Sequence, residues 1–411
     1  MNTTQLHIQQ QQLSLKRFPI NHFDKSLRAW DAADEYIIDH LASTFDLPSF
    51  RHIVIVNDSF GALACAMSKL APNAEISVFT DSYMAMCGIL QNLKGSNLDK
   101  NKVSIYSSVE IDTLEDKQTD LVLFKVPRTL AFLEYSLIEL NRVFAKNHGE
   151  YKPPTFVGGA MVKLVTSSVM KIFDDILAQT TTSLARKKAR LVFSLFPSTQ
   201  HPYISPVNEV SDNELDFVLH NYPNVFCRDQ VDIGARYMLK HLPEVTKPNQ
   251  VVIDLGCGNG VLGTSLLLDN KQNKHQAKVI FVDESYMAIE SAKATLFSSD
   301  ANDESKESAK FLVGHCLQTF SLSHNTLFDG GVDTVICNPP FHQQNTVIDD
   351  IAWQMFVDAK KVLKPGGELR IVGNRHLDHS AKLSKLFGGC KVIASDNKFT
   401  ILSALKPLSS E

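Results

Sequence analysis

The chain of 411 residues lacks a long hydrophobic run, an excess of positive charge and any grouping of cysteines. No apolar stretch approaches the roughly 18 residues that suggest a membrane-spanning helix. The amino terminus, 1–12, is polar and rich in glutamine, so it does not resemble a secretory signal. These absences predict a protein of the cytoplasm that has no membrane segment.

The charge balance excludes one class of protein. A net charge of −4 at pH 7 is incompatible with a uniformly basic coat for nucleic acid. Any binding of nucleic acid must therefore come from a local basic face.

The seven cysteines are scattered, and the sequence has no Cys-x-x-Cys pair and no histidine-rich tract at metal-ligand spacing. We interpret the cysteines as small apolar core residues in a reducing compartment. The sequence therefore predicts no disulfide and no metal site.

The length of the chain exceeds the usual size of a single hydrophobic core, which predicts two domains. The composition between residues 203 and 223 is mixed and includes prolines, so we place the boundary near residue 200. The predicted domains are 1–200 and 201–411.

The carboxyl-terminal half alternates short apolar runs with helical patterns. The runs 251–254, 279–282, 334–337 and 368–372 read as buried strands. Strands this apolar, separated by helices, indicate a parallel sheet covered on both faces, which is a doubly wound α/β fold. The polar stretch 298–310 lacks apolar periodicity and is interpreted as a solvated loop.

The amino-terminal half repeats this layout in a weaker form. Three segments, 53–61, 78–83 and 120–128, match 252–260, 281–286 and 333–341 in the same order, which indicates an internal duplication. The first copy keeps only Gly61 of the glycine cluster, and 125–128 replaces the later Asn-Pro-Pro-Phe. Chance similarity between two α/β layouts is the alternative.

Three glycines at alternate positions, Gly256, Gly258 and Gly260, follow a strand that ends in Asp254. Glycine permits the backbone to approach a nucleotide-like ligand because it places no side chain in the way. We interpret this loop as a binding site for S-adenosylmethionine, since its spacing favours a sulfonium nucleoside over a dinucleotide.

Two further positions complete the expected cofactor site. Asp283 lies at the end of the next strand, where a carboxylate can hold both ribose hydroxyls. His315 and Cys316 follow the strand after that and are candidate contacts for adenine. Burial of this histidine and cysteine in the core is an equal alternative.

The segment Asn338-Pro339-Pro340-Phe341 follows a later strand, at the edge of the sheet where the cofactor is expected. The side-chain oxygen of Asn338 and the carbonyl of Pro339 can accept the two N–H bonds of a planar amine. Phe341 offers a face on which an extruded base can stack. The tetrapeptide predicts methyl transfer to an amine conjugated to a ring or to an amide.

Several segments resemble the bacterial ribosomal RNA guanine-N2 methyltransferases. They are 226–236, 254–263, 282–285 and 337–343 in the carboxyl-terminal half, and 30–36, 57–63 and 185–190 in the amino-terminal half. The resemblance covers nearly the whole chain and is greatest to the enzymes of the large-subunit (23S) RNA, with those of the 16S RNA as close relatives.

The resemblance implies two tandem doubly wound, Rossmann-like methyltransferase domains. The second would be catalytic, of class I, with a seven-stranded sheet. The first would be inactive and would help to hold RNA. The resemblance further implies that Phe226, Asp232 and Gly234 contact the cofactor.

Basic residues of the amino-terminal half are candidate RNA contacts, with a solvated charged face as the alternative. The densest cluster lies at 186–190, and two further basic residues replace the lost reactive motif. The candidates are Lys125, Arg128, Arg186, Lys187, Lys188 and Arg190.

The leading hypothesis is a monomeric enzyme that methylates the exocyclic N2 amine of a guanine in 23S ribosomal RNA with S-adenosylmethionine. A guanine of 16S RNA is the first alternative, and adenine N6 or a glutamine of a protein factor are others. A different class of hypothesis is a non-catalytic RNA-binding or assembly protein. The intact glycine loop, Asp283 and Asn338 argue against that class, because decay should have removed them.

Overall fold

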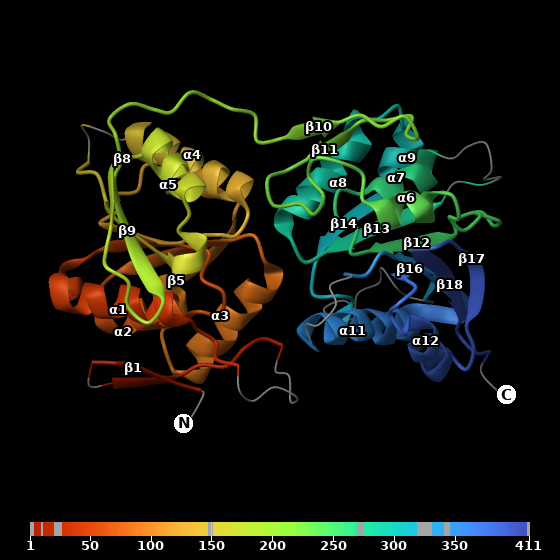
Figure 1. Cartoon of the computed structure of the whole chain (residues 1–411), viewed down its shortest axis with the longest axis horizontal. Coiled ribbons are helices and arrows are strands. Elements are labelled where there is room, and N and C mark those ends of the chain that lie inside the picture. Colours follow the sequence, from red (N-terminus) through yellow and green to blue (C-terminus); the bar gives the residue numbers. More distant parts are fainter. Residues whose placement is uncertain are drawn as a thin grey trace. The chain divides into compact units, whose positions relative to one another are not determined.

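The computed structural model describes residues 4–9, 11–19, 27–146, 149, 151–268, 275, 277–318, 331–340 and 346–408. The chain divides into two compact units, Met1–Ser205 and Pro206–Glu411 (Figure 1). The division falls close to the expected boundary at residue 200. Within the described part of the chain, no helix is long and apolar enough to cross a membrane.

The first unit contains a seven-stranded sheet in the order β5-β4-β3-β6-β7-β9-β8. The strands are β3 (His52–Val56), β4 (Glu75–Thr80), β5 (Val103–Ser107), β6 (Leu121–Lys125), β7 (Thr155–Met161), β8 (Ala178–Thr182) and β9 (Ala189–Leu195). The helices are α1 (Ala32–Thr44), α2 (Ala62–Leu70), α3 (Tyr83–Gly95), α4 (Leu130–Lys146) and α5 (Ser167–Ile176). A separate antiparallel hairpin joins β1 (Gln5–Ile8) to β2 (Gln11–Ser14).

The second unit contains a seven-stranded sheet in the order β14-β13-β12-β15-β16-β18-β17. Its strands are β12 (Val251–Leu255), β13 (Lys278–Asp283), β14 (Ala309–Val313), β15 (Val332–Cys337), β16 (Leu363–Asn374), β17 (Lys391–Ser395) and β18 (Phe399–Leu405). Its helices are α6 (Ile233–Leu239), α7 (Val261–Leu268), α8 (Tyr286–Ser298), α9 (Asp303–Glu307), α11 (Thr346–Val362) and α12 (His379–Phe387). A small hairpin pairs β10 (Asn208–Val210) with β11 (Leu219–Asn221).

The two sheets share one topology. In each, the first five strands are parallel to their neighbours and the last two are antiparallel. Val56 pairs with Phe124, as Leu255 pairs with Cys337, so the next residues, Lys125 and Asn338, occupy equivalent positions. The shared topology supports the hypothesis of an internal duplication.

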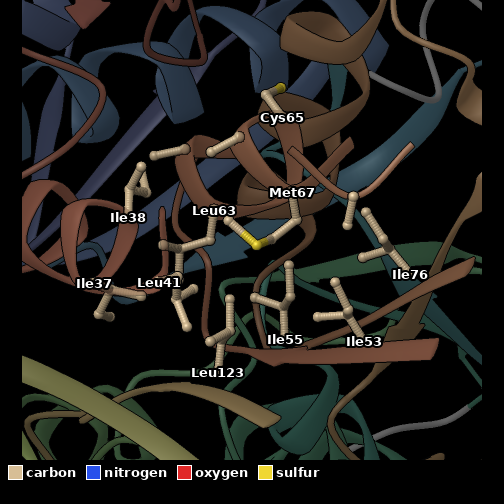
Figure 2. Close-up of a cluster of buried hydrophobic side chains, with 14 of the residues drawn as sticks. Ile37, Ile38, Leu41, Ile53, Ile55, Leu63, Cys65, Met67, Ile76 and Leu123 are labelled. Atoms are coloured by element: carbon tan, nitrogen blue, oxygen red, sulfur yellow. The ribbon is translucent and has the colours of Figure 1, made fainter. Parts of the chain in front are cut away.

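Alternating side chains of the central strands point to opposite faces of each sheet, as the doubly wound fold requires. In the first unit, Ile53 and Ile55 belong to one buried cluster, and Val54 and Val56 to another. Figure 2 shows the first cluster, where Leu63 and Met67 of α2 lie above the strand residues. The labelled Cys65 is also buried.

The interpretation of 298–310 as a solvated loop is wrong. The segment contains the short helix α9 and enters strand β14 at Ala309. Asn302 caps the helix by accepting a hydrogen bond from the amide of Ser305, and Asp303 favours the same helix start by its negative charge. Local capping and burial of Ser305 therefore order a stretch that lacks apolar periodicity.

Candidate active site

The glycine loop joins β12 to α7 and is tied to the neighbouring strand. The amides of Gly256 and Cys257 both donate to the carbonyl of Val282, at 2.8 and 3.1 Å. These bonds hold the loop at the carboxyl edge of the sheet, where doubly wound folds bind their ligands.

The three loop glycines have different tasks, although all have positive φ angles of 72°, 54° and 77°. A Cβ atom on Gly260 would lie 2.8 Å from the Cβ of Ala292, so this glycine lets α8 pack closely. A Cβ on Gly256 would lie 3.1 Å from the Met355 Cε. A Cβ on Gly258 would meet no described atom within 4 Å. Gly258 therefore borders the open space that a ligand could fill.

Asp283 connects the glycine loop to the start of α8. Its Oδ2 accepts a hydrogen bond from the amide of Gly258 at 2.9 Å, and its Oδ1 accepts one from the amide of Ser285 at 3.0 Å. A carboxylate oxygen can accept more than one hydrogen bond, so a carboxylate held in this position is suited to binding ribose hydroxyls. The contact between Asp283 and the ribose stays a prediction. The two hydrogen bonds fix the position of the Asp283 carboxylate.

Asp254 supports the loop from within. Its side chain is 1% exposed, and its Oδ2 accepts a hydrogen bond from the amide of Gly263 at 2.9 Å. Burial raises the pKa of this carboxyl group to about 7, and the negative Asp283 adds to the increase. We therefore assign Asp254 an indirect role, in place of the expected direct contact with the cofactor.

His315 and Cys316 lie just beyond β14, next to the strand that carries Asp283. The amide of Gly314 donates to the carbonyl of Asp283 at 2.9 Å, which places the following residues beside the predicted ribose site. Both side chains are buried. Burial lowers the pKa of His315 and raises that of Cys316, so the histidine is neutral and the thiol is protonated near pH 7. The adenine contact stays a prediction.

Asn338, directly after β15, forms a hydrogen bond with Asp232, the N-cap of α6. The Asn338 Nδ2 donates to the Asp232 Oδ2 at 2.9 Å, and the same oxygen accepts the amide of Ala235 at 2.8 Å. The Oδ1 of Asn338 is buried and has no hydrogen-bond partner in the described part of the chain. An unpaired buried acceptor costs roughly 1–3 kcal/mol, and a donor on a bound substrate would remove this cost.

The link to Asp232 fixes the orientation of the amide. Because the carboxylate accepts the NH2 group, the Asn338 oxygen must face away from it. Sequence reasoning assigned Asp232 only to the cofactor and missed this contact. The signal that was available is an aspartate directly before a helix, which is typical of an N-cap.

Four predicted site residues of this unit remain, and the structure describes all of them except Phe341. Gly234 is buried in the first turn of α6. Phe226 is 60% exposed, so its ring is free to contact a ligand. Pro339 is buried directly after Asn338, whereas Phe341 lies outside the described residues. The expected roles of these residues stay predictions.

The residues present fit S-adenosylmethionine. Gly258 borders open space, Asp283 is fixed at the end of the second strand, and the Asn338 oxygen needs a donor. Among the described residues, no group of histidine, cysteine and carboxylate side chains could hold a metal ion.

The first unit has a different arrangement at the equivalent place. Lys125, the counterpart of Asn338, forms ion pairs with Asp31 and Asp34, each at 2.7 Å. Asp31 is the N-cap of α1, just as Asp232 is the N-cap of α6. Burial raises the pKa of Asp34 to about 6, although Lys125 opposes the increase.

The prediction that Lys125 contacts RNA needs correction. Its side chain is only 11% exposed, and both neighbouring carboxylates already bind its ammonium group. The sequence pointed to this lysine because it replaces part of the lost reactive motif. The structure instead makes it a buried ion-pair partner.

The other predicted RNA contacts lie nearer the surface of the first unit. Arg128 is exposed, and Arg190 in β9 is half-buried. Arg186 pairs with Asp39 at 2.8 Å, and Lys187 pairs with Glu35 at 2.7 Å. Lys188 is exposed beside them at the tip of the β8–β9 hairpin. Their contact with RNA stays a prediction.

Comparison with known proteins identifies the family. The RLMG N-terminal domain matches residues 3–198, and the Methyltransferase small domain matches residues 216–403. The Ribosomal RNA large subunit methyltransferase G of Pseudoalteromonas translucida is 42% identical over 408 residues, which is 98% of each chain. The chain belongs to the large subunit methyltransferase G family.

Other comparisons agree with this assignment. The family member from Yersinia pestis (strain Pestoides F) is 40% identical, over 99% of this chain and 95% of its own. The solved structure of a T. thermophilus 16S rRNA N2 methyltransferase, RsmC, has the same fold, with a TM-score of 0.70 at 19% identity over 98% of this chain and 97% of its own. The predicted fold class and the prediction of an S-adenosylmethionine-dependent methyltransferase are confirmed.

Proposed function

We propose that this enzyme methylates the exocyclic N2 amine of a guanine in 23S ribosomal RNA, with S-adenosylmethionine as the methyl donor. The buried Oδ1 of Asn338 carries this proposal, because it needs a hydrogen-bond donor and stands beside the glycine loop. A planar amine supplies such a donor. The names of the relatives point to large-subunit RNA, and that of the structural neighbour points to N2 of guanine.

The residues of the chain position the amine and leave the proton to water. When bound, S-adenosylmethionine supplies a methyl group on an electrophilic sulfonium centre. Asn338 accepts one N–H of the amine, the Pro339 carbonyl accepts the other, and Asp232 keeps the amide from rotating. Asn338 cannot take up a proton at neutral pH, so the proton that the nitrogen loses goes to water.

The target guanine must be accessible at its amino group. In a duplex this group is stacked and paired, so the enzyme acts on an unpaired or extruded guanine. The first unit holds the surrounding RNA through basic residues near its surface.

We propose that the enzyme acts as a monomer in the cytoplasm.

A 16S target is the second candidate, because the structural neighbour that covers nearly the whole chain is named for 16S rRNA. The large-subunit assignment is favoured because those relatives are far more similar in sequence, at 40–42% against 19% identity. A difference in RNA target can arise from surface residues without any change in fold.

The test uses the purified full-length protein with radiolabelled S-adenosylmethionine and separate pools of 23S rRNA, 16S rRNA and ribosomal protein. We expect label in N2-methylguanine of 23S rRNA. Label in 16S rRNA alone would move the assignment to the small subunit, and label in protein alone would overturn the RNA proposal.

The role of Asn338 is tested with Asn338→Ala. We expect this variant to bind S-adenosylmethionine with unchanged affinity by calorimetry but to lose methyl transfer. Asn302→Ala is the matched control, because Asn302 only caps α9 and its replacement should lower stability without affecting turnover. Near-normal turnover of Asn338→Ala would show that the proposed mechanism is wrong.

A further inference from the structure

The first unit has a hollow of about 750 Å³ at the place that corresponds to the active site of the second unit. The amide of Asn57 donates to the carbonyl of Phe79, as the amide of Gly256 does to that of Val282, so the two loops align. By this alignment, the lining residue Ser59 corresponds to Gly258. Asp31, the counterpart of Asp232, also lines the hollow.

This hollow has lost the features that fit a methyl donor. Asp58 accepts hydrogen bonds from the amides of Gly61, Ala62 and Ala64, so a carboxylate of the chain already binds the start of α2. At the end of β4, Thr80 stands where Asp283 ends β13. A nucleoside cofactor therefore has neither its ribose carboxylate nor a free helix start here.

Arginine side chains held against aromatic rings line the hollow instead. The Arg17 guanidinium lies 5.0 Å from the ring centre of Phe60, and that of Arg28 lies 5.6 Å from the ring centre of Trp30. Such stacking restricts the guanidinium while its outer face and N–H groups remain available. A planar guanidinium binds phosphate through paired hydrogen bonds and also stacks on nucleobases.

The carboxylates of the hollow are already paired. Lys125 holds Asp31 and Asp34, and Glu35 binds Arg28 and Lys187 at 3.1 and 2.7 Å. Arg17 and Arg128 also line the hollow and have no ion-pair partner among the described residues. Within the described part of the first unit, the unpaired charge that a ligand meets in the hollow is therefore positive.

A second hollow of about 860 Å³ adjoins the first, since both are lined by Arg28 and Lys187. Its other side is the β1–β2 hairpin, which contributes Gln5, Gln9 and Gln12. Amide side chains both donate and accept hydrogen bonds, so they suit the edges of unpaired bases. This chemistry gives the glutamine-rich amino terminus a role that its sequence did not reveal.

The tip of the β8–β9 hairpin provides an independent observation. Arg186 and Ala189 exchange backbone hydrogen bonds at 2.9 and 2.8 Å, which leaves a two-residue turn at Lys187 and Lys188. Both lysines have positive φ angles, 48° and 63°, where Asn-Gly is the favoured pair. Lysine is strained in this conformation, and such strain is typical of functional sites.

We propose that the two hollows form one groove that binds a single-stranded segment of the RNA substrate. The phosphates lie first on the unpaired Arg17 and Arg128, and Arg28 and Lys187 contribute the donors that their pairs with Glu35 leave over. The base edges lie along the glutamines of the β1–β2 hairpin. This inference rests on the proposed function, and it places RNA in the site from which the first unit has lost the methyl donor.

The first test measures binding of single-stranded and duplex 23S rRNA fragments over a range of salt concentrations. Arg17→Gln combined with Arg128→Gln should weaken single-strand binding about tenfold and make the slope of log K against log salt shallower by about 0.7 for each phosphate that is no longer bound. Arg17→Lys with Arg128→Lys keeps the charge and should retain most of that slope. Lys171→Gln is the control, because Lys171 pairs with Asp175 on α5 and lies outside both hollows.

The outcomes separate this inference from the proposed function. If the unaltered enzyme does not methylate RNA, the proposed function fails. If it methylates RNA but the double glutamine variant binds with the affinity and salt slope of the control, the groove proposal fails. Equal affinity of the unaltered enzyme for duplex and single-stranded RNA would show that the groove does not select a single strand.

The second test uses the strained turn. Lys187→Asn with Lys188→Gly supplies the residues that this turn prefers, so the melting temperature should increase. If Lys187 binds RNA, affinity should decrease at the same time and the KM for RNA should rise. An increase in stability with unchanged RNA affinity would overturn the role of the hairpin tip.

Discussion

The Nδ2 of Asn338 donates a hydrogen bond to the carboxylate of Asp232 at 2.9 Å, across 106 positions of sequence. The helix before the glycine loop thus sets the orientation of the residue that is expected to meet the substrate. The first unit keeps the same link between a helix cap and a strand end, with Asp31 and Lys125 in these positions. The same pairing of a helix cap with a strand end therefore positions the Asn338 side chain in the second unit and the Lys125 ion pair in the first.

The two roles of Asp232, as helix cap and as partner of Asn338, can be tested with variants that keep one hydrogen bond and lose the other. One oxygen accepts from both Asn338 and the amide of Ala235, so Asp232→Asn can keep both bonds and should retain most turnover. Asp232→Ser keeps a helix cap, but its side chain is shorter, so stability should be preserved while kcat falls about a hundredfold. Asp232→Ala should lose both, with about 1 kcal/mol of stability removed.

Thermal melting, calorimetry with S-adenosylmethionine and steady-state kinetics distinguish the roles of Asp232. A positioning role predicts unchanged cofactor affinity in Asp232→Ser. Weakened cofactor binding with normal kcat would instead support the cofactor contact that the family resemblance implies.

Sequence patterns predicted those parts of the structure that depend on local composition. The apolar runs around Ile253 and Ile280 indicated buried parallel strands, and both runs form strands of the second sheet. The glycine loop and Asn338 follow these strands, so their place at the sheet edge could be inferred from the order of elements. Strand order within each sheet required the structure.

Contacts between distant residues could not be predicted from sequence. The Asp232–Asn338 bond depends on how α6 packs against the sheet, and no local pattern contains that information. Lys125 resembled a surface cation, because burial of a lysine needs partner carboxylates that are far away in the sequence. The tasks of Gly258 and Gly260 likewise became distinct only when their surroundings were known.

Gly258 and Gly260 should respond differently to alanine. Both have positive φ angles, so each substitution introduces backbone strain. Gly260→Ala also places a methyl group 2.8 Å from the Cβ of Ala292, so it should destabilise the second unit by several kcal/mol. Gly258→Ala enters open space, so it should cost about 1 kcal/mol but reduce cofactor affinity.

Differential scanning calorimetry with and without S-adenosylmethionine measures both effects of these glycine substitutions. The ligand-induced increase in melting temperature should be reduced in Gly258→Ala. An equal loss of stability in the two variants, with normal cofactor affinity for Gly258→Ala, would contradict the assignment of Gly258 to the cofactor side.

Asp254 should make the stability of the second unit depend on pH. The pKa of Asp254 is about 7 in the folded protein, against 3.8 for an aspartate in water, because burial disfavours the carboxylate. The folded protein therefore binds a proton that the unfolded chain releases, and stability falls as pH rises from about 4 to 7. Asp254→Asn removes this loss and keeps an oxygen for the Gly263 amide.

The melting temperature of Asp254→Asn, relative to the unaltered protein without cofactor, should therefore increase between pH 5 and pH 8. Measurements at several pH values in one salt concentration test this. A difference that stays constant over the whole range would show that Asp254 does not titrate there.

Lys125 provides a test of the ion pairs that occupy the position equivalent to Asn338 in the first unit. Lys125→Met leaves Asp31 and Asp34 without their cation, which should cost about 3–5 kcal/mol near pH 8. The pKa of Asp34 is already about 6, and loss of the lysine should raise it further. Since a protonated carboxyl needs no cation, the loss should be smaller at pH 5 than at pH 8.

Lys146→Met is the matched control for Lys125→Met, because Lys146 forms a solvent-screened pair with Glu115 whose removal should change stability little at either pH. Urea unfolding at pH 5 and pH 8 gives both quantities. Normal stability of Lys125→Met together with weakened RNA binding would restore this lysine as an RNA contact. A large, pH-dependent loss of stability would instead establish that the first unit uses the position equivalent to Asn338 for its own fold.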